Sequence, residues 1–209
     1  MPFEENTLTS EQQALDYINK YGVVTLFPVK NLPFPSLYKA TKGNRQEKFE
    51  NAWKWADELG YKKQIHYGKL VRKQVTFCSI EMFPYFYKLY RNTPLSQTAQ
   101  RILDIIKQNG PTSTTILRKS LDLWGKEKKS EFLKAMDQLQ MAFAVAIVSR
   151  EKPPRQTHIY DLTENWMPKV LLQKAESIAE ATAKEKILAK MLKNQIISNP
   201  QDLKRILPK

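Results

Sequence analysis

The chain has 209 residues, of which 42% are hydrophobic and 11% aromatic, so it can bury a real core and is not disordered. Thirty-four basic side chains against twenty-one acidic ones give a net charge of +13, which favours a polyanionic partner, although many basic surfaces are merely solvated. The longest apolar run, 141–148, is far too short to cross a bilayer, so we expect no membrane-spanning helix and no membrane partner.

The first residues, MPFEENTLTSEQQ, have neither a basic head nor an apolar core, so we expect no secretory signal. The only cysteine, Cys78, excludes an intramolecular disulfide and fits a reducing compartment. We therefore expect a cytoplasmic protein.

Residues 1–92 are predicted to form an α+β unit that begins with a helix and a strand. SEQQALDYINKYG predicts a helix that Ser10 caps and Gly22 ends, and VVTLF predicts a buried strand. A long loop follows, punctuated by three prolines.

The same unit then predicts a second helix, QEKFENAWKWADELG, and a hairpin, QIHYGKLVRKQVTFCS, which turns near Arg72 and Lys73. IEMFPYFYKLY returns to helix, and Glu81 is expected to cap it. This order suggests a winged-helix variant with the proline-rich loop as an insertion.

Residues 93–162 give the clearest pattern. A helix with an apolar isoleucine stripe stops at Asn109-Gly110-Pro111, and Thr112 or Ser113 can cap a short second helix. KEKKSEFLKAMDQLQ predicts an amphipathic third helix. Then AFAVAIVSREKPPRQTHIYDL predicts a hairpin with a basic, proline-interrupted tip. Three helices and a hairpin in this order are typical of a winged helix, with the hairpin as its wing.

This layout suits DNA, because a helix fits the major groove and a hairpin beside it reaches phosphates or the minor groove. Acidic residues share the third helix, so the alternative is a winged helix used for packing or protein contacts. We favour DNA as the partner, bound through its phosphates. The candidate contact residues are Lys126, Lys129, Lys134, Arg150, Lys152 and Arg155.

Residues 163–209 are predicted to be an alanine-rich helical connector followed by a truncated helix-turn-helix. The segments 101–121 and 186–207 share one plan: a helix, a polar turn with proline, and a short helix. The predicted fold class is therefore α+β: tandem winged-helix units, mainly helical, with short antiparallel hairpins.

No catalytic residue and no metal site emerges from the sequence, and we expect no cofactor. Two histidines and one cysteine do not make a recognisable zinc site, and the scattered glycines form no phosphate-binding loop. His66, Tyr67 and Lys69, near Trp53, can line a small pocket, although aromatic residues so placed are more often core.

The order of GVVTLFPVKNLPFPSLYKA, HYGKLVRKQVTFCSIEMFPYFYKLY, the predicted winged helix of residues 96–162 and TENWMPKVLLQKA resembles the AlkZ-related proteins, shorter relatives of the AlkZ (YcaQ-type) DNA glycosylases. The resemblance covers most of the chain. It implies tandem winged helices, a DNA-facing concave surface and a link to DNA repair. In the catalytic relatives it implies excision of a damaged base.

Catalytic members resemble one another in a glutamine-apolar-acid or glutamine-apolar-glutamine motif just after the first helix. Thr25-Leu26-Phe27 stands at that place here, and neither threonine nor phenylalanine can hold a water or offset a cationic sugar as a carboxylate or amide does. The expected function is non-catalytic DNA binding. An active glycosylase with non-standard residues and a protein-interaction scaffold stay open, as do the oligomeric state and the DNA or damage preference.

Overall fold

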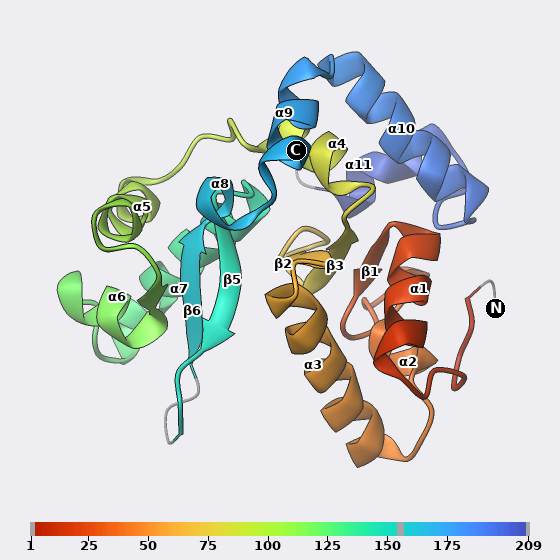
Figure 1. Cartoon of the computed structure of the whole chain (residues 1–209), viewed down its shortest axis with the longest axis horizontal. Coiled ribbons are helices and arrows are strands. Elements are labelled where there is room, and N and C mark those ends of the chain that lie inside the picture. The colour runs from red at the N-terminus through yellow and green to blue at the C-terminus, as the bar shows by residue number, and fades with distance from the viewer. Residues whose placement is uncertain (1–2, 154–156, 208–209) are drawn as a thin grey trace.

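The computed structural model describes residues 3–153 and 157–207 (Figure 1). Helices alternate with short antiparallel strands, so the predicted α+β class, mainly helical with short hairpins, is confirmed. In the described ranges no helix is long and apolar enough to cross a membrane.

The first unit has one three-stranded antiparallel sheet in the order β1-β3-β2, and the helices surround it. Its elements are α1 (Glu11–Tyr21), β1 (Val23–Thr25), α2 (Leu37–Ala40), α3 (Arg45–Tyr61), β2 (Ile65–Gly68) and β3 (Thr76–Ser79). All three strands are fully buried, including their polar residues Thr25, His66, Thr76 and Ser79.

Local sequence signals set the ends of these elements. The Ser10 side chain accepts a hydrogen bond from the backbone of Gln13 at the start of α1, and Gly22 ends that helix with φ 80°. Asn44 and Glu47 form a capping box at α3. The β2–β3 turn is at Arg72 and Lys73, where both residues have positive φ.

The second unit repeats the element order and the sheet order of the first. Its elements are α5 (Gln97–Asn109), β4 (Thr112–Ser113), α6 (Thr114–Ser120), α7 (Lys126–Met141), β5 (Val145–Arg150) and β6 (His158–Leu162). The strands pair antiparallel in the order β4-β6-β5. Phe132, Met136, Leu139 and Phe143, the predicted apolar face of the third helix, are all buried.

The remaining helices are α4 (Phe83–Tyr90), α8 (Thr163–Trp166), α9 (Lys169–Ser177), α10 (Glu180–Lys193) and, after a 3₁₀ turn at Pro200–Asp202, α11 (Leu203–Ile206). Of these, α8 lies beside the β5–β6 hairpin, and the others lie along the upper and right-hand edge of the view (Figure 1). The segment predicted to be a helical connector thus contains three separate helices, α8, α9 and α10. The last two of these cover α4.

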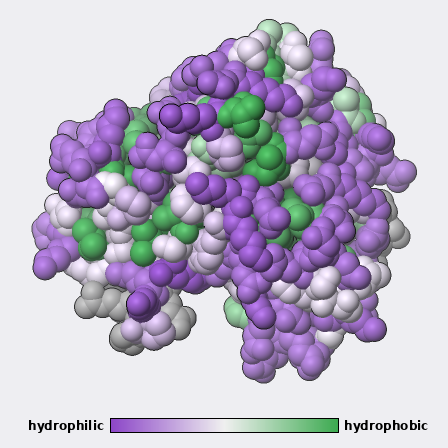
Figure 2. Space-filling model, viewed as in Figure 1, coloured by the Kyte–Doolittle hydropathy of each residue, from purple (hydrophilic) through white to green (hydrophobic). Residues whose placement is uncertain are grey.

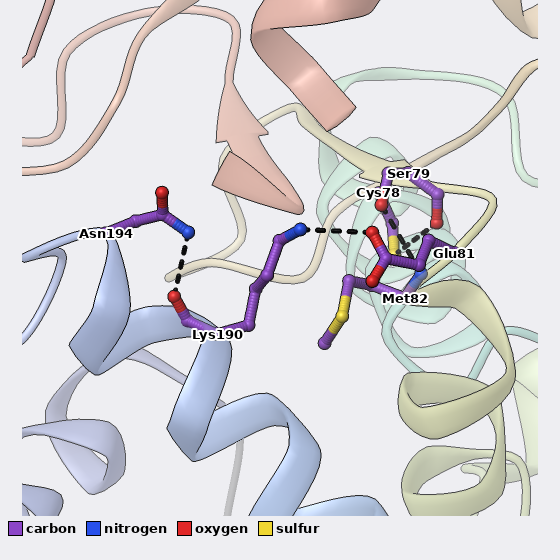
Figure 3. Close-up of polar contacts among 6 residues, drawn as sticks. All are labelled: Cys78, Ser79, Glu81, Met82, Lys190 and Asn194. Atoms are coloured by element: carbon purple, nitrogen blue, oxygen red, sulfur yellow. Dashed lines mark hydrogen bonds and ion pairs between the residues drawn. The ribbon is translucent and has the colours of Figure 1, made fainter. Parts of the chain in front are cut away.

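One predicted cap is wrong. The Glu81 side chain does not cap α4, which has no side-chain cap. Its carboxylate instead accepts a hydrogen bond from Lys190 of α10 at 3.0 Å (Figure 3). The Ser79 hydroxyl takes the local role and accepts from the backbone N–H of Met82. A contact across more than one hundred residues of sequence has replaced the local one.

Candidate functional site

The two units meet along α3 and β2 on one side and β5 and α7 on the other. Two ion pairs cross this seam. Arg150 donates to both carboxylate oxygens of Asp57, at 2.7 and 3.3 Å, and Lys69 donates to Asp137 at 2.7 Å. The Arg150 guanidinium also lies over the Trp53 ring, 5.5 Å from its centroid. Charge and aromatic contacts together hold the units in register.

A cavity of about 350 Å³ lies at this seam. Both units line it, with aromatic, aliphatic and charged side chains. The lining residues are Trp53, Tyr67, Lys69, Val75, Thr114, Phe132, Leu133, Met136, Asp137, Gln140, Ile147, Arg150, Thr157, His158 and Tyr160. Figure 2 shows one face of the molecule, on which hydrophilic residues predominate and apolar residues form small separate patches.

Burial shifts the acid–base groups around the cavity. It raises the pKa of Asp57, although the hydrogen bond and charge of Arg150 oppose the rise. Burial, with the nearby charges of Arg150 and Lys69, lowers the pKa of His158 to about 4. At neutral pH the imidazole of His158 is therefore uncharged, and Lys69 and Arg150 are the cations of the lining.

The Tyr67 hydroxyl is buried and has no hydrogen-bond partner among the described residues, and the same is true of the Tyr61 hydroxyl and of Nε2 of His66. Only 3% of Tyr67 is exposed. Burial raises the pKa of this phenol well above its usual value, and the Asp57 carboxylate adds to the rise. The hydroxyl thus stays protonated.

The structure brings together three of the four residues predicted to line a pocket: Trp53, Tyr67 and Lys69. His66 lies elsewhere. Its ring stacks on Phe143 with the centroids 4.5 Å apart, inside the core, and burial lowers its pKa to about 3. Neighbouring side chains on a strand point to opposite faces, which explains why Tyr67 lines the cavity and His66 does not.

The cationic residues predicted to contact DNA have different environments. Lys129, Lys134 and Lys152 are exposed. Arg150 is two-thirds buried and bound to Asp57. The side chain of Lys126 and the whole of Arg155 lie outside the described residues.

These lysines do not all share one surface. Lys129 and Lys134 are five positions apart, which turns them about 140° around the axis of α7. Lys129 continues the row of Leu133 and Asp137, which line the cavity, at helical spacing. Lys129 therefore extends the face of α7 that turns toward the first unit.

Sequence reasoning missed the residues that join the units: Asp57, Asp137 and His158 were not expected at a site. In the sequence Asp57 follows Ala56 and Asp137 follows Met136. Both therefore look like ordinary polar positions on the surface of an amphipathic helix. No sequence signal marks either as the partner of Arg150 or Lys69, because the partners are 93 and 68 positions away.

The side chains of Thr25, Leu26 and Phe27, which the resemblance led us to compare with the glycosylase motif, are used for packing. The Thr25 hydroxyl is buried and donates to the carbonyl of Pro35 at 3.2 Å, and Leu26 is fully buried. Phe27 stacks on Phe49 with the centroids 5.9 Å apart, at the edge of a wide groove of about 970 Å³.

A protein-family model described as AlkZ related matches residues 8–208, nearly the whole chain. No curated protein matches the sequence.

Proposed function

The chain belongs to the AlkZ-related family, and we propose that it is a tandem winged-helix protein that binds duplex DNA through phosphate contacts, without the base-excision chemistry of AlkZ-type glycosylases. The observation that carries this proposal is the repeated order helix, strand, helix, helix, hairpin, with the first strand pairing the last in both units. That connectivity is the one expected of a winged helix. The second unit presents exposed lysines on its third helix and hairpin.

The geometry narrows the surface that would meet DNA. The C-terminal half of α7 faces the first unit, because Asp137 pairs with Lys69 and the backbone of Gln140 comes close to Gly68. Arg150 is held by Asp57. We therefore assign the contacts to the exposed part of α7, at Lys129, and to the hairpin, at Lys152, two positions beyond Arg150.

The test is a titration of labelled duplex DNA, followed by fluorescence anisotropy. Lysine–phosphate contacts release counterions, so the two assigned contacts predict a fall in affinity of roughly 12-fold between 50 and 200 mM salt. The double variant Lys129→Glu with Lys152→Glu should weaken binding at least tenfold.

The matched control is Lys184→Glu with Lys186→Glu. These two exposed lysines are on α10, so the variant has the same change in net charge at a different place. It should bind DNA nearly as the natural protein does. Affinity that is independent of salt, or equal losses in both variants, would reject the proposed surface.

The proposed lack of chemistry is supported by the packing of Thr25 and Leu26, which leaves no carboxylate or amide at that place. The test is incubation with alkylated and crosslinked DNA, followed by a search for abasic sites. Abasic product above that of a heat-denatured sample would show a glycosylase that uses other residues.

A further inference from the structure

Trp124 is the one exposed residue among the four tryptophans, all of which are in the described part of the chain: 47% of it is exposed. It lies in the turn between α6 and α7, directly before Gly125, the N-cap of α7. A single exposed apolar side chain is common on protein surfaces. What distinguishes Trp124 is how its ring is held and which charges surround it.

Hydrogen bonds from both flanking helices fix this turn. Arg118 of α6 donates from Nε to the carbonyl of Leu123 at 3.0 Å, and the backbone N–H of Leu123 donates to the carbonyl of Arg118 at 2.9 Å. Lys128 of α7 donates to the carbonyl of Asp122 at 2.8 Å and to its carboxylate at 2.6 Å. The backbone just before Trp124 is thus held from two sides, so little conformational entropy is lost when a ligand contacts the ring.

The Arg118 guanidinium also orients the indole. Its central carbon lies over the Trp124 ring, 4.9 Å from the centroid. The same carbon is 6.0 Å from the ring centroid of Phe132, a buried residue of α7. Arg118 therefore contacts both the core and the indole. A half-exposed aromatic ring that is held in one orientation is a surface on which a nucleobase stacks, because every base has a flat π-face.

The surroundings of Trp124 are basic. Residues 118–129 contain five basic and two acidic side chains, a net charge of +3. Lys128 and Asp122 neutralise each other, whereas Lys129, in the first turn of α7, is exposed. The matching ligand has a flat apolar ring with negative charge beside it. A nucleotide combines the two in one unit, which favours nucleic acid over an apolar protein surface as the partner of this turn.

Stacking on the indole requires a base with an uncovered face. Within a paired duplex the neighbouring base pairs cover both faces of every base. Unstacking such a step costs about as much free energy as one aromatic contact returns. A base that is already unpaired carries the smallest cost of this kind.

We propose that Trp124 stacks on an unpaired base of bound DNA while Lys129 contacts a phosphate near it, so that the protein prefers a duplex interrupted by an unpaired nucleotide to a fully paired one. Arg118 is then a positioning residue, since it acts through the indole. This inference rests on the DNA binding proposed above and adds the class of DNA that the same surface selects.

Two labelled duplexes of the same sequence provide the test, one fully paired and one with a single unpaired thymidine near its centre. Fluorescence anisotropy at one low salt concentration gives both affinities. The natural protein should bind the interrupted duplex roughly fivefold or more tightly, which corresponds to the lower end of the effect of one base stacked on an aromatic side chain. Equal affinities for the two duplexes overturn this inference and leave the proposed function intact, whereas no binding to either duplex rejects both.

Trp124→Leu keeps an apolar side chain and removes the flat ring. It should bind the paired duplex as the natural protein does and lose the preference for the interrupted one, whereas Trp124→Phe should keep most of that preference. The matched control is Trp166→Leu, because Trp166 of α8 also has a cation over its ring, Lys63, at 4.3 Å from the centroid. It should keep the full preference. Circular dichroism checks that each variant is folded, and a preference that survives in folded Trp124→Leu overturns the inference.

The intrinsic fluorescence of the indole gives a second readout. Stacking on a base should quench Trp124, so the emission of the natural protein should fall when the interrupted duplex is added. That of Trp124→Phe should not fall, although this variant binds. Unchanged emission of the natural protein at saturation contradicts the stacking. The same conclusion follows if Trp124→Leu keeps the DNA preference and instead abolishes self-association in sedimentation, because the ring then belongs to a contact between protein copies.

Discussion

Gly22 shows how one residue serves both a local and a distant requirement. Its φ of 80° ends α1 in the left-handed region that favours glycine. A Cβ at this position would lie 2.8 Å from Cγ of Met82 and 3.1 Å from Cγ of Lys190. A side chain at this position would therefore force the side chains of Met82 and of Lys190, on α10, to move.

Gly22→Ala should lower the free energy of unfolding by about 2–4 kcal/mol, as the sum of backbone strain and overpacking. Gly110→Ala is the matched control. Gly110 also has positive φ, 72°, but nothing lies within 4 Å of its Cβ position, so only the backbone strain applies, about 1–3 kcal/mol. Urea unfolding of both variants measures the difference, and equal losses would contradict the close approach.

The two histidines predict how stability depends on pH. Burial lowers the pKa of His66 to about 3 and that of His158 to about 4, whereas an unfolded histidine titrates near 6.5. Below about pH 6.5 the unfolded chain thus binds more protons than the folded one, and stability falls as the pH falls.

Between pH 7 and pH 5 we expect a loss of about 2 kcal/mol for each histidine, measured by urea unfolding at a series of pH values. His158→Gln should remove about half of this dependence and leave the part that belongs to His66. A free energy of unfolding that stays constant over this window would show that neither imidazole is kept neutral.

At the scale of elements, the fold depends on contacts between α3 and β5. Asp57, on α3, is 17% exposed in its side chain and Arg150, on β5, is 32% exposed. Two hydrogen bonds join them, and Trp53, one turn before Asp57 on α3, lies beneath the guanidinium. The helix of one unit is thus fixed to the hairpin of the other.

A double-mutant cycle with Asp57→Asn and Arg150→Met should give a coupling energy of about 2 kcal/mol, because hydrogen bonds between partly buried charged groups are among the stronger ones. The comparison cycle is Glu81→Gln with Lys190→Met. The side chain of Glu81 is 64% exposed, so that coupling should be at most about 0.5 kcal/mol. Similar values from the two cycles would contradict this ranking.

At the scale of the whole molecule, the C-terminal segment completes a shared core. On α10 the residues Ala183, Ile187 and Met191 are buried, and they lie on the side of the helix that packs on α4. Phe86 of α4 in turn stacks on Phe143, which follows α7 in the second unit. The three parts of the chain therefore share one continuous apolar interior.

A chain that ends at residue 177 should lose cooperative unfolding. It lacks α10 and the buried side chains after it, each worth roughly 1.5–3 kcal/mol of burial, and the sum exceeds the stability of a typical domain. Ile187→Ala removes part of one buried side chain of α10 and leaves the rest of the segment in place. It should lower the free energy of unfolding by about 2–4 kcal/mol. Circular dichroism in urea, with dye binding to exposed apolar surface, measures both, and a cooperative transition at an unchanged midpoint would contradict this account.

The elements themselves could be predicted from the sequence because their causes are local. Ser10 and Gly22 bound α1, the spacing of Phe132, Met136 and Leu139 indicates the buried face of α7, and the turn at Arg72 and Lys73 separates β2 from β3. Caps, turns and apolar periodicity act over a few residues, and their signal is in the neighbouring letters.

The contacts between elements were decided only by the tertiary structure. Arg150 looked like a cation free for a phosphate until Asp57 was found beside it, and Glu81 looked like a cap until Lys190 was found to bind it. The free energy of a charged or polar group depends on what surrounds it, and here those surroundings come from residues that are distant in the sequence.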